Sequence, residues 1–208
     1  MTCLNARLQA LRCFALTAVF IVSGCSLLSP PEAPKSTYYS LDAAPALAPA
    51  TKPATPITLI INPPRAAAGF DSHRIIYVRD PHKLQYFAQS EWIDPPARML
   101  GGLLVTAIER SGSFGAVVLS AGSASGDLRL DTEIVRLQHE FQTTPSLVRF
   151  TLKATLVDDK SRRVLAGREF EATASAASED PYGGVVAANQ AVQAVLKDLS
   201  LFLTERPK

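Results

Sequence analysis

Cysteine is scarce in this sequence, and all three cysteines lie within the first 25 residues, at positions 3, 13 and 25. The chain beyond Cys25 therefore cannot form an internal disulfide, and it offers neither a thiolate metal ligand nor a cysteine nucleophile. Histidine is equally scarce, with His73, His82 and His139 as its three occurrences. They are scattered over two expected loops and one expected strand, which favours solvated or structural roles over a metal site.

Catalytic sequence signatures are missing as well. The chain contains no Gly-x-Ser-x-Gly elbow, no Walker loop, no Gly-x-Gly-x-x-Gly and no His-Glu-x-x-His. The acidic pair Asp158-Asp159 lies at an expected hairpin tip, where such residues favour turns, so it does not indicate acid–base chemistry. We therefore expect a protein that is not an enzyme and that uses no cofactor and no metal.

The first 24 residues have the composition of an export signal. Arg7 and Arg12 precede an uncharged apolar run from Cys13 to Val22, which is too short to span a bilayer. The run ends in Val22-Ser23-Gly24-Cys25, which resembles the lipobox of bacterial lipoproteins. The resemblance implies cleavage before Cys25 and attachment of fatty acyl chains such as palmitate to it, which gives an essentially permanent membrane anchor. An ordinary secretory signal or an uncleaved anchor is the alternative.

Without these 24 residues, the chain has no excess of charge of either sign. Lys and Arg together number 21 and Asp and Glu number 19, and the signal carries two arginines but no acidic residue. The balance that remains gives no indication of nucleic acid binding or of an anionic partner surface.

Residues 25–56 are expected to tether the folded domain to the membrane. Ser26, rather than aspartate, after the modified cysteine resembles lipoproteins that are sorted to the outer membrane. Pro, Ala, Ser, Lys and Thr dominate the segment, and this composition favours an extended linker. Tyr38-Tyr39-Ser40-Leu41-Asp42 interrupts it, and we interpret it as an added edge strand or a docking segment, because paired tyrosines suit half-buried surfaces. A short apolar patch within a linker is the other interpretation.

The folded domain is predicted to occupy residues 57–208 and to have an α+β fold. Turns at Asp80-Pro81-His82 and Asp158–Ser161 predict a hairpin and a three-stranded meander. In strand 127–141 the apolar positions change from even to odd, which requires a β-bulge near Ile134-Val135. The predicted strands are 57–61, 74–79, 83–88, 114–119, 127–141, 148–156 and 163–174.

Two amphipathic helices complete the expected fold. Asp94 followed by Pro95 predicts the start of the first helix, and Gly112 predicts its end. A close approach to the sheet is one explanation for Gly101-Gly102 inside it. Asp180-Pro181 predicts the start of the second helix, for which core packing and partner binding are the two interpretations. We therefore expect a mixed, mainly antiparallel sheet with both amphipathic helices packed on one face. The apolar positions are Leu100, Leu103, Leu104, Ala107 and Ile108, and then Val185, Ala188, Val192, Val195, Leu196, Leu199, Phe202 and Leu203.

Large aromatic side chains are concentrated between residues 74 and 92, where two arginines accompany them. Aromatic residues and arginine are enriched in binding hot spots. One interpretation is an exposed hairpin that docks a partner, and the other is packing in the core and within the hairpin. The candidate contact residues are Arg74, Tyr77, Arg79, Tyr86 and Trp92.

The order of these features resembles the ABC-type transport auxiliary lipoprotein family, the paraquat-inducible protein C-like lipoproteins. The resemblance rests on the lipobox and spacer, Tyr38–Leu41, Ile75–Arg79, the aromatic strand Leu84–Phe87, Trp92 before a helix, and a long closing helix. It implies a non-enzymatic component of a lipid transport system that includes an ABC permease, an ATPase and a periplasmic partner of the mammalian-cell-entry type. The lipoprotein would receive or anchor the far end of that partner at the outer membrane, facing the periplasm.

Two other functions fit the same residues. A direct lipid-binding module would use the last helix to close an apolar cavity over the sheet. A structural lipoprotein would instead serve an outer-membrane barrel or a secretion complex. A homo-oligomer is also compatible with the apolar and aromatic strands.

Overall fold

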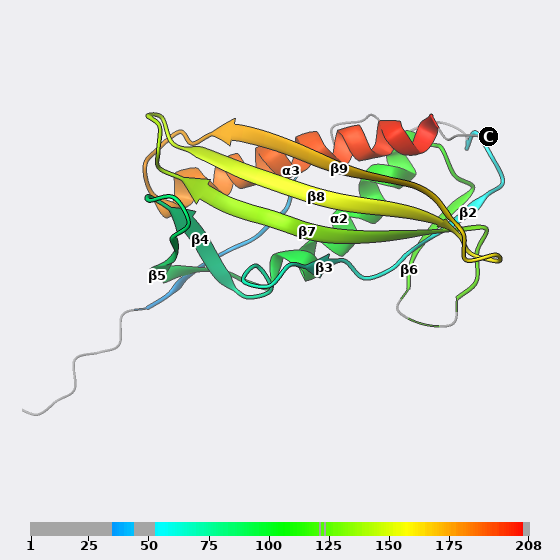
Figure 1. The fold of residues 1–208 in the computed structure, drawn as a ribbon, viewed down its shortest axis with the longest axis horizontal. Coiled ribbons are helices and arrows are strands. Elements are labelled where there is room, and N and C mark those ends of the chain that lie inside the picture. The colour runs from blue at the N-terminus through cyan, green and yellow to red at the C-terminus, as the bar shows by residue number, and fades with distance from the viewer. Residues whose placement is uncertain (1–34, 44–52, 121, 123, 206–208) are drawn as a thin grey trace, which may run out of the picture. The chain divides into compact units, whose positions relative to one another are not determined.

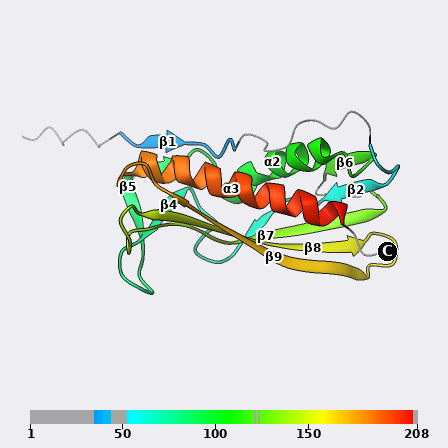
Figure 2. The same cartoon turned by 90° about the horizontal axis from the view of Figure 1, so that it is seen from above.

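Strand β7, Leu128–Glu140, lies at the centre of a single mixed sheet. The computed structural model of the 208-residue chain describes residues 35–43, 53–120, 122 and 124–205, which apart from Lys35 belong to the unit Ser36–Lys208. In these residues nine strands form the sheet, and helices α2, Pro96–Ser111, and α3, Pro181–Thr204, cover one of its faces (Figures 1 and 2). The predicted α+β fold with a mixed, mostly antiparallel sheet is confirmed.

The two edges of β7 have different partners. One edge is antiparallel to β8 along its length, and β8 is antiparallel to β9, which confirms the predicted meander. The opposite edge is shared by β2, β3 and β4, which run parallel to β7 and follow one another along it. Strand β6 lies beyond β2, again parallel. The bounds are Thr58–Ile61 (β2), Arg65–Ala66 (β3), Arg74–Val78 (β4), Ala116–Leu119 (β6), Leu147–Asp158 (β8) and Val164–Ser175 (β9).

The pairing between β7 and β8 shifts by one residue near the middle of β7. Ile134 lies opposite Leu152 and Arg136 lies opposite Thr151, so that among the described residues Val135 has no cross-strand partner on β8. The extra residue allows Ile134 and Leu137 to be buried under the helices although they differ in parity. The predicted β-bulge is confirmed.

Strands β4 and β5, Leu84–Trp92, form the predicted antiparallel hairpin, and β1, Thr37–Tyr39, runs parallel to the other edge of β5. The predicted edge strand is therefore confirmed. Leu41 and Ala43, which follow β1, belong to the hydrophobic core. The packed unit begins at Ser36, so it includes part of the segment 25–56 that is predicted to be the tether.

Helix α2 begins one residue later than predicted, because two prolines follow Asp94. Pro95 is the N-cap, with φ −49° and ψ 134°, and Pro96 is the first helical residue. A residue that precedes proline is driven toward extended backbone, so Pro96 excludes Pro95 from the helix. Asp94 forms an ion pair with Arg98 instead, with 3.3 Å between Oδ1 and Nη1. The prediction of Asp94 as N-cap is wrong.

The three glycines of this region have different roles. Gly112 ends α2 in the left-handed conformation, with φ 66°, as predicted. A Cβ at Gly101 would lie 3.1 Å from Leu119 Cδ2, so the close approach to the sheet explains this residue. A Cβ at exposed Gly102 would have no neighbour within 4 Å, so the same explanation does not apply there.

Helix α3 starts and packs as predicted. Asp180 Oδ1 accepts a hydrogen bond of 2.8 Å from the Gly183 N–H, which caps the helix. The apolar stripe that follows is buried against the sheet, apart from half-buried Phe202. A Cβ at Gly184 would lie 2.5 Å from His139 Nδ1, so glycine permits the first turn to approach β7. Helix α3 is thus a core helix.

Two glycine substitutions should have opposite effects on stability. Gly102→Ala places a better helix former at an unobstructed position, so we expect the free energy of unfolding to rise by about 1 kcal/mol. Gly184→Ala forces a methyl group against His139 and should lower it by about 1–3 kcal/mol. Urea unfolding followed by circular dichroism measures both, and equal effects would contradict the packing of α3 described here.

Candidate functional site

The β4–β5 hairpin carries its predicted contact residues on two opposite faces. Tyr86 is paired with Ile76, whereas Tyr77 is paired with Gln85. Because successive strand residues point to opposite faces, Tyr86 and Tyr77 lie on different sides of the hairpin. The structure places Arg74 with Tyr86 on one side and Arg79 with Tyr77 on the other.

The outer hairpin face consists of Arg74, Leu84 and Tyr86. The Arg74 guanidinium carbon lies 4.0 Å from the centre of the Tyr86 ring, a cation–π contact. Tyr86 and Leu84 are each 52% exposed, although both are large and largely apolar. Arginine and tyrosine are enriched in binding hot spots, and this face, where the pair lies beside an exposed leucine, is our candidate functional site.

The opposite face of the hairpin holds an aromatic cluster that leads inward. Arg79 lies 5.6 Å from the Tyr77 ring centre and 5.2 Å from that of Phe141. The Tyr77 and Phe87 ring centres are 4.6 Å apart, and those of Phe141 and His139 are 4.1 Å apart. These contacts attach the hairpin to β7, so this face serves packing more than contact with a partner.

Trp92 is not a contact residue. Its side chain is 3% exposed and belongs to the hydrophobic core. It lies at the end of β5, in register with Tyr39 of β1, so β5 is no longer an open edge at this point. The prediction that Trp92 contacts a partner is therefore corrected, because a partner cannot reach a core side chain in this fold.

His139 belongs to β7 and is buried against the start of α3. Its Nε2 lies 2.7 Å from Ser146 Oγ, and Nδ1 has no hydrogen-bond partner among the described residues. Burial lowers the pKa of His139, although the nearby carboxylates of Glu179 and Asp180 act in the opposite direction. A neutral histidine held in this way has a structural role.

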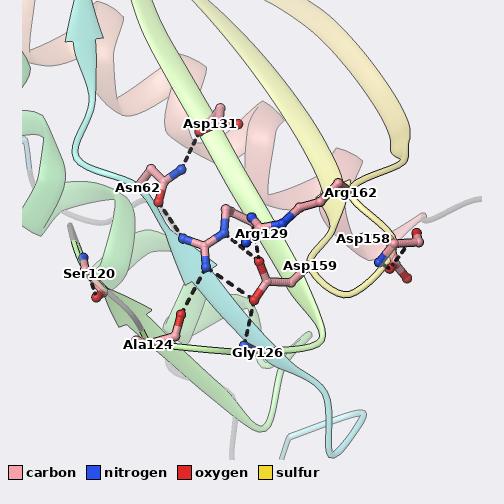
Figure 3. A network of polar contacts seen from close by, with 11 residues as sticks. Asn62, Ser120, Ala124, Gly126, Arg129, Asp131, Asp158, Asp159 and Arg162 are labelled. Carbon is pink, nitrogen blue, oxygen red and sulfur yellow. Dashed lines mark hydrogen bonds and ion pairs between the residues drawn. The ribbon is translucent and has the colours of Figure 1, made fainter.

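A buried polar network lies near the opposite end of β7, around Arg129 (Figure 3). Arg129 Nε donates to Asp159 Oδ1 at 2.7 Å, and Nη2 donates to Asp159 Oδ2 at 3.2 Å. Nη1 donates to Asn62 Oδ1 at 2.7 Å, and Nη2 donates to the Ala124 carbonyl at 3.0 Å. The Gly126 N–H donates to Asp159 Oδ2 at 2.9 Å. The network joins the end of β2, the segment before β7 and the β8–β9 turn.

The sequence pattern did not reveal this network. Arg129 alternates with buried Leu128 and Leu130, which predicts a solvent-facing side chain, but the β8–β9 turn covers it with Asp159. Only 11% of the Arg129 side chain and 5% of the Asp159 side chain remain exposed. Hydrogen bonds from Arg129 lower the pKa of Asp159 to about 2, and the Gly126 N–H contributes as well. The side chains are mutually satisfied, which makes this a structural clamp.

The cavity described between α3 and the sheet is small. The cavity lined by Ile75, Trp92, Leu137, Val148 and Ala188, among others, has a volume of about 10 Å³. Pockets for drug-sized ligands usually measure about 300–1,000 Å³. This cavity therefore has no room for an acyl chain beneath the last helix.

The described part of the chain offers neither a metal site nor a membrane-spanning helix. There, no group of three or more His, Cys, Asp or Glu side chains is arranged to hold a metal ion. None of the helices in that part is long enough and apolar enough to cross a bilayer. Cys25 and the predicted signal, residues 1–24, lie outside the described residues.

The family model described as ABC-type transport auxiliary lipoprotein component matches residues 39–200. This chain belongs to that family. The match begins in β1 and ends within α3, so it includes the hairpin, the sheet and both helices. As an ABC-type transport auxiliary lipoprotein, the protein is a component of the bacterial cell envelope that is associated with a transport system.

Two solved structures share the fold of this auxiliary lipoprotein. The Xanthomonas campestris protein XCC0632, of the family DUF330, is 27% identical with a TM-score of 0.70, over 79% of this chain and 93% of that chain. An uncharacterized protein is 11% identical with a TM-score of 0.60, over 80% of this chain and 97% of that chain. No curated protein matches the sequence.

The Arg129–Asp159 clamp should make stability depend on acidity. Because the pKa of Asp159 is about 2 in the folded state and 3.8 ordinarily, the unfolded state takes up the proton first. The contribution of the ionised Asp159 carboxylate to the free energy of unfolding is fully present above about pH 4 and is lost as the pH falls through 2. Asp159→Asn should lower the urea midpoint at pH 7. The difference in midpoint between this variant and the wild type should shrink as the pH falls from about 4 to 2. Asp198→Asn, at an exposed position of α3, is the control for removing one carboxylate. A difference that is constant with pH would contradict this role of Asp159.

Proposed function

We propose that this auxiliary lipoprotein is the docking subunit of an ABC-type lipid transport system, with a periplasmic protein of the mammalian-cell-entry type as its partner. The observation that carries the proposal is the outer hairpin face, where Arg74 is stacked on Tyr86 beside exposed Leu84. Pairing of β4 with β7 and of β5 with β1 holds this face in a fixed geometry before any partner arrives. A preformed surface reduces the conformational entropy lost on binding.

The other components of the system would carry out the transport itself. In this proposal the ABC permease and ATPase supply the energy, and the lipoprotein has no catalytic role. It holds the far end of the mammalian-cell-entry-type partner at the outer membrane and so contributes to envelope integrity. The small volume of the cavity described under α3 supports a docking role over direct lipid binding in the core.

Acylation of Cys25 would keep the docking surface near the membrane. Since Ser36 already belongs to the packed unit, only residues 26–35 connect Cys25 to it. About ten residues span at most roughly 35 Å when fully extended. Strand β1 emerges from this connection and pairs directly with β5 of the hairpin. The anchor therefore limits how far the hairpin can lie from the bilayer.

The proposed anchor predicts a change of cell fraction. Cys25→Ser should move the protein from the membrane fraction to the soluble periplasmic fraction and remove the mass of the acyl chains, because the attachment atom is gone. Ser26→Asp should keep the acyl chains but retain the protein at the inner membrane. Cys13→Ser is the matched control, which should change neither property. Unaltered fractionation of Cys25→Ser would refute the anchor.

The docking proposal predicts crosslinks from the hairpin. A photoreactive residue at 84 or 86 should capture the mammalian-cell-entry-type protein in cells, and one at exposed Lys153 on the sheet should not. Arg74→Ala or Tyr86→Ala should weaken binding of the purified partner by roughly 30-fold, the scale of a hot-spot contact. Each should cost only about 1 kcal/mol of stability, because the cation–π pair is exposed.

Other captured molecules would redirect the assignment. Crosslinks to lipid alone would favour a lipid-binding module, and capture of a barrel or secretion component would favour a structural lipoprotein. Crosslinks between two copies of this chain would identify the face as a homo-oligomer interface.

A further inference from the structure

A groove of about 570 Å³ runs between the segment that contains β1 and the exposed side of α3. Tyr38 on one wall is 57% exposed, and Tyr182 on the other is 64% exposed. Among the described residues that line the groove, Asp42 is the one that carries a charge. The remaining lining combines apolar side chains such as Val185 and Val186 with hydroxyl and amide side chains, including Ser40, Asn189, Gln190 and Gln193.

This lining restricts the chemistry of a ligand. A phosphate or a phospholipid headgroup would require cationic side chains, and the described lining has none. An acyl chain would prefer a dry apolar channel, whereas this groove is open and rich in hydrogen-bonding groups. A neutral ligand with many hydrogen-bonding groups fits best, which leaves a polypeptide backbone or a glycan.

The backbone of β1 favours the polypeptide. The Ile93 N–H donates to the Tyr39 carbonyl at 2.7 Å, so the backbone groups of Tyr39 are directed to β5. Those of the neighbouring residues, Tyr38 and Ser40, are directed to the other side, where α3 lies. An edge strand with outward N–H and C=O groups is a template for pairing with a further strand.

Helix α3 already binds extended backbone on this side. Asn189 Nδ2 donates to the Ser40 carbonyl at 3.2 Å, and Asn189 Oδ1 accepts from the Asp42 N–H at 2.8 Å. One amide side chain thus recognises the backbone of two alternate residues. The Tyr38 backbone, directed to the same side, has no such partner on α3 among the described residues.

We propose that this groove binds an extended polypeptide segment, which pairs with the Tyr38 backbone and packs against Tyr182 and Val186 of α3. Strand addition supplies main-chain hydrogen bonds, and the tyrosine and valine side chains supply the apolar contact. The site is formed by β1 and α3, so it is separate from the outer hairpin face and does not rest on it.

The test uses the full-length protein in detergent and a phage-displayed library of random linear dodecapeptides. Enriched peptides are labelled, and their affinity is measured by fluorescence anisotropy. Val186→Arg fills the groove and should weaken binding at least tenfold. Ala194→Arg, on an exposed position of the same helix outside the groove, is the matched control and should not. Tyr38→Pro removes the outward N–H of residue 38 but leaves the hydrogen bonds of Thr37 and Tyr39 to β5. It should therefore also weaken peptide binding, and the loss of affinity should be larger than that caused by Tyr38→Thr.

The opposite results would overturn the proposal. Failure to enrich any peptide would do so, as would enriched peptides whose affinity is unchanged by Val186→Arg. Binding of chitotetraose that is abolished by Val186→Arg, without peptide binding, would identify a glycan site instead. Circular dichroism of each variant shows whether the fold is retained.

Discussion

Both edges of β7 are hydrogen-bonded to other strands, and the arrangement of the remaining elements depends on this. Because β8 takes the whole of one edge, β2, β3 and β4 share the other and meet β7 at successive points. As a result, β2 leads to Asn62 beside Arg129 near one end, and β4 places Tyr77 beside His139 at the other. The bulge at Val135 lies between these points and keeps apolar side chains toward the helices.

The two ends of β7 are stabilised by different chemistry, and this division bears on function. At one end Arg129 and Asp159 satisfy each other in a nearly buried clamp. At the other end the aromatic cluster around His139 packs the hairpin, while Arg74, Leu84 and Tyr86 remain accessible. Figures 1 and 2 show the hairpin and the start of α3 at the same end of the unit. The hairpin that carries the proposed docking face and the proposed peptide groove, which is formed by β1 and the start of α3, therefore lie at the same end of the unit.

Sequence patterns predicted the elements whose geometry depends on near neighbours. The change of parity in β7 required a bulge, Asp180 before Pro181 indicated a cap, and Gly112 indicated a helix end, and each is confirmed. The Asp94 cap failed for a local reason too, because a second proline moved the helix start. The candidate site was predicted less completely. Arg74 and Tyr86 form an exposed pair, Arg79 and Tyr77 lie on the opposite face, and Trp92 is in the core.

The sequence by itself determined the α+β pattern, the lipobox and the resemblance to the auxiliary lipoproteins, because these depend on residue types at fixed short spacings. Only the tertiary structure decided which polar and aromatic side chains a partner can reach. Trp92 is buried where β1 pairs with β5, and Arg129 is buried by a turn that lies 30 residues away in the sequence. The Tyr38 backbone faces an open groove because α3, from the end of the chain, forms the other wall. Exposure depends on segments that are distant in the sequence, and no local pattern contains that information.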